Sequence, residues 1–200
     1  MFAVVTDGTI TSFPQGNKGI TINDIQYPKA IYSLWTEAER NAIGIYTVEI
    51  DATNRKDETY YINTDISYAF GSGKVTGSYG TATAKAIADA NAKDENGDDL
   101  DPVIVIKGLK TQYKDNFNAQ AAGLLAPTDW YVVKATEVSD YSVPSAITTY
   151  RAAVRTKVNA METAIDGCAN VAALITLLTY TLQEDGTTTR PLGEFPDEVI

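Results

Sequence analysis

Residues 144–167 have the sequence Pro-Ser-Ala-Ile-Thr-Thr-Tyr-Arg-Ala-Ala-Val-Arg-Thr-Lys-Val-Asn-Ala-Met-Glu-Thr-Ala-Ile-Asp-Gly. Their apolar side chains recur every three or four positions, which places them on one face of an α-helix. The members of this face are Ile147, Tyr150, Val154, Val158, Met161 and Ile165. A proline at the start and a glycine at the end are common helix limits. The stretch therefore predicts one long helix with a buried face.

Helical spacing also precedes this stretch. The apolar positions that share one face there are Ile106, Leu109, Tyr113, Phe117, Ala121 and Leu124. Pro127 is expected to end that helix, since proline cannot continue it without losing a hydrogen bond. Thr128 is then expected to be the N-cap of a short helix that carries Trp130 and Val133.

A further helix is expected after the long one. Asn170 is a suitable N-cap, and apolar positions continue from Val171 to about Leu182. Short connections that contain proline or glycine favour antiparallel neighbours. Residues 104–182 should therefore form a small antiparallel helical bundle.

The first part of the chain has β-strand patterns with strong turn signals. Asp7-Gly8 is a hairpin turn that joins the short apolar segments on either side of it. Gly71-Ser72-Gly73 predicts a second hairpin, between residues 59–64 and residues 74–79. Residues 45–51 alternate apolar and polar side chains, which is typical of a half-buried strand.

One short helix is expected within this β-rich part. Thr36 and Glu39 have the spacing of a capping box, and Gly44 can end the helix in the left-handed conformation. The expected fold class is thus α+β. It combines an N-terminal antiparallel β module over residues 1–92 with a C-terminal helical bundle and an extended tail.

An acidic run separates the two patterns. Asp89–Asp101 holds six acids against one lysine, half of the net charge of the whole chain. We expect residues 93–103 to be a solvated loop or a linker between domains. The spacing of Asp94, Glu95 and Asp98 lacks the alternating oxygen ligands of an EF-hand loop, so a plain turn is favoured over a calcium site.

The last part of the chain, residues 183–200, has two prolines, two glycines and no periodic apolar pattern. Such a segment should be an extended tail. We expect its apolar side chains to fasten it to its own domain or to a partner. The candidate anchors are Leu192, Phe195, Val199 and Ile200.

Composition excludes several classes of function. The chain of 200 residues has 16 basic and 26 acidic side chains, a net charge of −10, which should repel nucleic acid. It has no histidine and one cysteine, Cys168, so the usual nucleophile–base pairs, zinc cages and internal disulfides are absent. We therefore expect no enzyme, no cofactor and no metal ion, and Cys168 as a buried small apolar side chain. The opening residues lack a basic region, and no apolar run reaches membrane-helix length, so we expect no signal peptide and no membrane insertion.

Two kinds of side chain remain as candidates for function. Arg151 and Arg155 lie one turn apart on the long helix, either as a docking surface for an acidic partner or as a solvated face. Trp130 is either a core residue or an interface anchor. The candidate partner interface consists of Trp130, Arg151, Arg155, Leu192 and Phe195.

Carboxylates could still support hydrolysis of carbohydrates, which needs only two acids on facing elements. The candidates are Asp65, Asp129, Glu137 and Asp140. Asp129 has a simpler role in the first turn of its helix, where a carboxylate interacts favourably with the helix dipole. We therefore rank a hydrolase third among the functions considered.

Several segments together form a recognisable combination. They are Leu124–Trp130, Glu137, Val143-Pro144, Tyr150-Arg151 and Val154-Arg155, with Tyr27-Pro28, Trp35–Arg40 and Ile43–Tyr46 nearer the N-terminus. This combination resembles the tail assembly chaperones and tail fibre accessory proteins of tailed bacteriophages. The segments cover about a third of the chain. Val154 stands where leucine is usual in that family, and Thr156 where an acid is common.

The resemblance implies a non-enzymatic bacteriophage tail protein that binds a tail fibre or baseplate component and assists fibre assembly. Such a protein would be found on the virion tail or in the host cytoplasm during assembly, and a homotrimer would match the symmetry of a fibre. The alternative is a structural tail fibre or baseplate subunit whose tyrosine-rich β module contacts host surface glycans.

Overall fold

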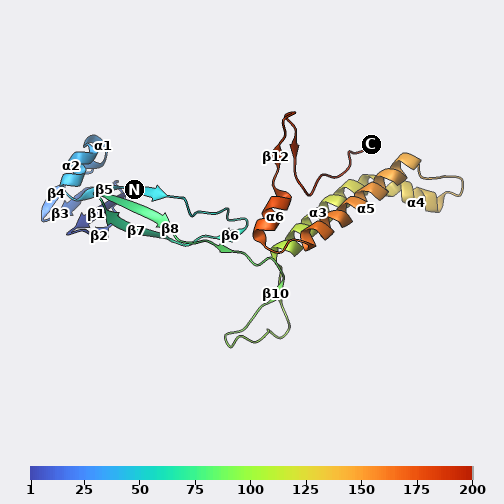
Figure 1. Cartoon of the computed structure of the whole chain (residues 1–200), viewed down its shortest axis with the longest axis horizontal. Helices are drawn as coiled ribbons and strands as arrows, with labels where there is room; N and C mark the ends of the chain where they lie inside the picture. The colour runs from blue at the N-terminus through green and yellow to red at the C-terminus, as the bar shows by residue number, and fades with distance from the viewer. Residues whose placement is uncertain (200) are drawn as a thin grey trace. The chain divides into compact units, whose positions relative to one another are not determined.

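A computed structural model describes residues 1–199 of the chain (Figure 1). The chain divides into two compact units, the first over Met1–Thr83 and the second from Ala84 onward. The first unit contains a β-sheet, and the long helices belong to the second. The predicted α+β class, with an N-terminal sheet and C-terminal helices, is therefore confirmed. The acidic run lies within the second unit.

The sheet of the first unit has five strands in the order β2-β1-β5-β8-β7. These strands are β1 (Phe2–Thr6), β2 (Thr9–Ser12), β5 (Ile45–Asp51), β7 (Ile66–Gly71) and β8 (Lys74–Tyr79). The β1–β2 hairpin turns at Asp7 and Gly8, whose φ angles are 50° and 75°. Two consecutive positive φ angles give the turn the twist of the flanking strands, so this hairpin forms as predicted.

The second hairpin has the predicted turn but a different first strand. Its turn lies at Ser72 and Gly73, with φ angles of 51° and 76°. The partner of β8 is β7, with Phe70 opposite Val75, so the predicted pairing of residues 59–64 is wrong. Residues 66–71 alternate between half-buried and exposed side chains and adjoin the turn directly. Within 59–64, only β6 (Tyr61–Ile62) is a strand, and it pairs with β9 (Thr83–Ala84).

The expectation of an entirely antiparallel module is also wrong. β5 and β8 run parallel, with Val48 opposite Val75. A parallel pair needs a long crossover between its strands. Here residues 52–73 supply that crossover and place β7 on the far side of β8.

Both faces of the sheet are covered. One face packs against α1 (Ile31–Leu34), α2 (Glu37–Ala42) and the hairpin of β3 (Ile20–Ile22) and β4 (Ile25–Tyr27). The buried residues on this side are Val4, Ile22, Ile31 and Ile45. The other face buries Ala3, Val48 and Val75, and both Ile10 of β2 and Phe70 of β7 pack against them. Because β2 and β7 are the two outer strands, the sheet is curled, and the rings of Phe13 and Tyr68 meet with centroids 4.6 Å apart.

Helix α2 begins and ends as the sequence predicts. The Thr36 hydroxyl accepts the Glu39 N–H at 3.3 Å, and the Glu39 carboxylate accepts the Thr36 N–H at 2.8 Å. These two bonds form the predicted capping box. Gly44 follows the helix with a φ angle of 82°, a conformation that glycine adopts without strain.

The second unit is built around two long helices. Its elements are β10 (Ala90–Asn91), β11 (Val105–Ile106), α3 (Leu109–Leu125), the 3₁₀ turn η1 (Ala126–Thr128), α4 (Asp129–Glu137), α5 (Ser145–Asp166), α6 (Val171–Leu178), β12 (Thr181–Leu182) and β13 (Thr188–Thr189). Helices α3 and α5 run antiparallel. The Tyr150 hydroxyl at one end donates to the Leu124 carbonyl at 3.3 Å, and Lys114 pairs with Asp166 at 2.9 Å at the other end.

The predicted inner face of α5 is buried along its whole length. Its residues are Ile147, Tyr150, Val154, Val158, Met161 and Ile165, and they share the core with Leu109, Phe117, Ala121, Leu174 and Leu178. Asn170 caps α6 as predicted, because its side chain accepts the Ala173 N–H at 2.9 Å. The start of α3 and the end of α6 differ from the prediction. Ile106 belongs to β11 and is exposed, and α6 ends at Leu178, so Leu182 lies in β12.

The acidic run lies in a hairpin whose side chains are mostly exposed to solvent. Residues 89–107, hereafter the arm, contain the β10–β11 ladder, which leads directly into α3 (Figure 1). At the tip, the Asp94 carboxylate accepts the N–H groups of Asn96 and Asp98 at 2.8 and 3.0 Å. At the base, the Asp89 carboxylate accepts the N–H of Gly108 at 2.8 Å. These local bonds hold the turn at the tip of the arm and its connection to α3.

The base of the arm should loosen in acid. The Gly108 N–H, followed by the Thr111 side chain, lowers the pKa of Asp89 below its ordinary value. A carboxyl with a lowered folded pKa stabilises the fold above its unfolded pKa, about 3.9, and loses that contribution as the pH falls through the folded pKa. We expect amide exchange at Gly108, measured relative to its intrinsic rate at each pH, to accelerate selectively below about pH 4.

Two variants check this expectation. Asp89→Asn keeps an acceptor oxygen but cannot titrate, so the selective acceleration at Gly108 should disappear. Asp101→Asn, an exposed carboxyl on the same arm, should leave it unchanged. Equal acceleration at Gly108 in the parent chain and in Asp89→Asn would contradict the assignment.

Candidate protein–protein interface

Arg151, a predicted interface residue, is held inside the second unit. Its side chain is 11% exposed and forms an ion pair with Asp129 at 2.7 Å. The same guanidinium donates to the Leu125 carbonyl at 3.1 Å and to the Thr128 hydroxyl at 2.5 Å. Arg151 thus joins α5 to the end of α3, the η1 turn and the start of α4, and it is largely removed from solvent.

Thr128 does not cap α4 as predicted. Its side chain is fully buried, and its hydroxyl donates back to the Leu125 carbonyl at 2.7 Å. The Thr128 hydroxyl therefore caps the C-terminal end of α3 and accepts a hydrogen bond from Arg151. Arg155, one turn further along α5, is exposed, and no ion pair or hydrogen bond of its side chain is found within residues 1–199. The two arginines lie one turn apart on α5, but Arg151 is largely buried and bonded whereas Arg155 is exposed to solvent.

Helix α4 presents an apolar surface to solvent. None of its residues is buried, and Trp130 is 51% exposed. We define the α4 surface as Trp130, Val132, Val133 and the adjoining Val138, all of which are exposed. The ring of Trp130 lies 3.9 Å from that of Tyr131, and the Lys134 ammonium lies over Trp130 at 5.7 Å and over Tyr141 at 4.3 Å. An aromatic side chain with one cation beside it is a common composition of binding surfaces.

The tail is attached to the helices through Leu192. This side chain is buried, its N–H donates to the Leu177 carbonyl at 3.1 Å, and its carbonyl accepts from Lys157 at 2.7 Å. Leu192 is thus an anchor within its own unit, one of the two destinations expected for the tail. Phe195 is half-buried, Val199 is exposed, and Ile200 lies outside the described residues.

Arg190 adds a second attachment of the tail. Its guanidinium lies over the rings of Phe117 and Tyr180, at 5.3 and 4.8 Å, and pairs with Glu194 at 2.8 Å. The hydrogen bond with Glu194, with burial as a second cause, raises the pKa of Tyr180. These contacts connect the tail to α3 without forming a catalytic arrangement.

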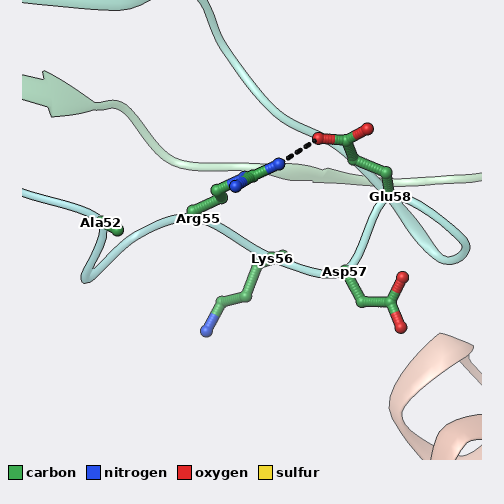
Figure 2. Close-up of a pocket in the computed structure, with 5 residues that line it drawn as sticks. All are labelled: Ala52, Arg55, Lys56, Asp57 and Glu58. Carbon is green, nitrogen blue, oxygen red and sulfur yellow. Dashed lines mark hydrogen bonds and ion pairs between the residues drawn. The ribbon is translucent and has the colours of Figure 1, made fainter. Parts of the chain in front are cut away.

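Figure 2 shows a hollow of about 510 Å³ in the connection that follows β5. All of its lining residues come from one short segment: Ala52, Arg55, Lys56, Asp57 and Glu58. Arg55 pairs with Glu58 at 3.0 Å, and both side chains are more than half exposed. Because a single solvated loop supplies every wall, this hollow does not bring together groups from different elements as an active site does.

The remaining acidic candidates are distributed over both units. Asp129 is paired with Arg151, Asp65 belongs to the first unit, and Glu137 and Asp140 belong to the second. Within residues 1–199, no group of three or more acidic or thiol side chains is placed to hold a metal ion. Cys168 is buried, and its thiol faces the Ala164 carbonyl at 3.5 Å. Among residues 1–199, no helix is long and apolar enough to cross a membrane.

Sequence reasoning missed a second exposed apolar surface. Residues 103–106, Val-Ile-Val-Ile, were expected partly in the acidic linker and partly at the start of a helix. They form the returning side of the arm's hairpin, with β11 at Val105–Ile106, and all four side chains are exposed. Four consecutive β-branched residues are a strand signal, and it was present in the sequence.

Comparisons with known proteins identify no relative. A scan against protein-family models, a search of curated proteins and a search of solved structures each return no match.

Proposed function

We propose that this chain is a non-enzymatic bacteriophage tail protein that binds a tail fibre or baseplate component through its helical unit and assists fibre assembly. The observation that carries the proposal is the α4 surface. It lies within the part of the chain whose sequence resembles tail fibre assembly proteins, between Leu124–Trp130 and Val143-Pro144.

The energetics of α4 support a binding role. A nine-residue helix is marginal in water, and most helical stability in proteins comes from the packing of an apolar face. Here that face is exposed, with one tryptophan and three valines in or beside the helix. A partner that covered these side chains would remove apolar area from water and stabilise the helix at the same time.

In this proposal the second unit acts as a small antiparallel helical bundle that offers α4 to the fibre. The apolar side chains would cover fibre surface that is exposed before the fibre trimerises. Binding of this kind needs no catalytic group, cofactor or metal ion. It would occur in the host cytoplasm during assembly, and the protein would stay on the virion tail if the contact persisted. Three copies would match the symmetry of a fibre.

Particle composition tests the proposed location. Mature particles would be purified and this chain quantified by mass spectrometry against the major tail protein. A ratio that corresponds to three or six copies per particle supports a virion component. Absence from particles, with co-purification of the fibre protein from infected cells, supports an assembly chaperone. Detection with neither would refute the proposal.

Substitution on α4 tests the proposed surface. Trp130→Ser combined with Val133→Ser should weaken binding of the fibre protein by about tenfold or more, because a buried aromatic anchor commonly supplies about 2 kcal/mol. Leu182→Ser, at another highly exposed apolar position, is the matched control and should bind normally. Unchanged affinity of the double variant would exclude α4 as the contact. Binding of host glycans by the first unit alone would instead support the alternative of a receptor-binding subunit.

A further inference from the structure

The arm carries an aliphatic segment, residues 103–106, that ends in β11 and is more than half exposed. Val103, Ile104, Val105 and Ile106 are each 54–58% exposed. Successive side chains of a strand point to opposite faces. Val105 and Ile106 of β11 therefore expose aliphatic side chains on opposite faces of the ladder.

The backbone of β11 is also open on one side. Asn91 and Val105 face each other between hydrogen-bonded neighbours, because Ala92 donates to the Ile104 carbonyl at 2.7 Å. In an antiparallel ladder, such a facing pair directs its N–H and C=O groups outward. In the described chain, β10 is the one strand that pairs with β11. A two-stranded ladder is marginal in water and gains stability from a third strand.

The charge of the arm indicates what that third strand should be. Residues 89–107 contain six carboxylates and two lysines, and both lysines are already paired, Lys93 with Asp99 and Lys107 with Asp115. Glu95, Asp98 and Asp101 have no ion-pair partner within residues 1–199. A second copy of the arm would bring like charges together, which is unfavourable, whereas a strand with basic flanks is complementary.

We propose that the arm binds an extended segment of another protein, with an aliphatic centre and lysine or arginine flanks, as a third strand on the open edge of β11. Hydrogen bonds to Val105 set the register of the added strand. Its aliphatic side chains cover residues 103–106, and its basic flanks meet the unpaired carboxylates. This interaction is additional to the α4 surface and does not depend on the chain being a tail protein.

A synthetic peptide tests the proposal. The probe has a Val-Thr-Val-Thr-Val centre flanked by lysine pairs and carries a fluorescent label. Its binding to the full-length protein is followed by anisotropy at several salt concentrations. We expect saturable binding that weakens as salt increases, because the flanking charges contribute to it. A peptide of the same centre with glutamate flanks should not bind.

Two variants of Val105 separate strand addition from simple charge attraction. Val105→Pro removes the outward N–H and leaves the bonds between β10 and β11 in place, since proline is tolerated at a strand edge. It should weaken binding of the lysine-flanked peptide by about tenfold, the size of one lost hydrogen bond. Val105→Thr keeps the N–H and should bind like the parent protein. Circular dichroism of both variants checks that the fold is retained.

Each other outcome overturns the proposal. If Val105→Pro binds the lysine-flanked peptide as well as the parent protein does, the attraction is electrostatic and no strand is added. If neither peptide binds, or both bind equally, the proposed partner chemistry is wrong. Self-association that Val105→Pro abolishes would identify a second copy as the occupant. Because α4 is unchanged in the Val105 variants, these measurements do not affect the separate test of fibre binding by the α4 surface.

Discussion

Replacement of Arg151 by alanine is expected to destabilise the second unit by about 1–3 kcal/mol, the usual cost of leaving a buried polar group without its hydrogen-bond partner. The guanidinium is 11% exposed and joins the Leu125 carbonyl, the Thr128 hydroxyl and the Asp129 carboxylate. Its loss leaves a fully buried hydroxyl without its donor and opens a gap beneath the α3–α4 connection. Urea unfolding followed by circular dichroism would measure the change.

Arg155→Ala is the matched control for this measurement. It removes the same side chain one turn further along α5, at an exposed position, and should change the free energy of unfolding by less than about 0.5 kcal/mol. Arg151→Lys should recover only part of the loss, because an ammonium cannot reproduce the planar fork of a guanidinium. Equal stability of Arg151→Ala and Arg155→Ala would show that the buried network contributes nothing.

Leu174→Ala is expected to cost about 2–5 kcal/mol, the range for a buried leucine whose removal leaves a cavity. Leu174 is fully buried on α6, which attaches the end of the helical unit and the tail that follows it. Leu182→Ala, at a side chain 71% exposed, provides the control and should be nearly neutral. The free energy of unfolding would again be measured in urea.

The same experiment tests whether the two units unfold separately. Each unit contains one tryptophan, Trp35 in the first and Trp130 in the second. With Trp130 replaced by phenylalanine, the fluorescence of Trp35 reports on the first unit alone. Leu174→Ala should leave the midpoint of that signal unchanged. A shift of the Trp35 transition equal to that of the helices would show that the chain unfolds as a single cooperative unit.

The sequence pattern predicted most features that lie within a single helix, strand or turn. The face of α5 from Ile147 to Ile165 follows from a repeat of 3.6 residues, and every member of it is buried. The β1–β2 turn at Asp7-Gly8 and the capping box at Thr36 also depend on local chemistry, so they could be identified from a few neighbouring residues.

What periodicity could not supply is the partner of each element. The strand at residues 66–71 and the parallel pairing of β5 with β8 depend on contacts between distant segments, which spacing does not reveal. The same limit applies to the candidate interface. Arg151 and Arg155 are equivalent by position on the helix. Only the fold shows that one faces the α3–α4 connection and the other faces solvent.

The curl of the first unit's sheet bears on how the protein would avoid aggregation. Because β2 and β7 meet over a shared core, the sheet does not present two long, flat edges onto which further copies could polymerise. The exposed aliphatic segment is instead the short one at residues 103–106, with Asp98, Asp99 and Asp101 close before it in the sequence. Charged residues beside such a segment act as gatekeepers against amyloid-like stacking. The negative charge of the arm would then oppose self-association of the protein before a partner binds.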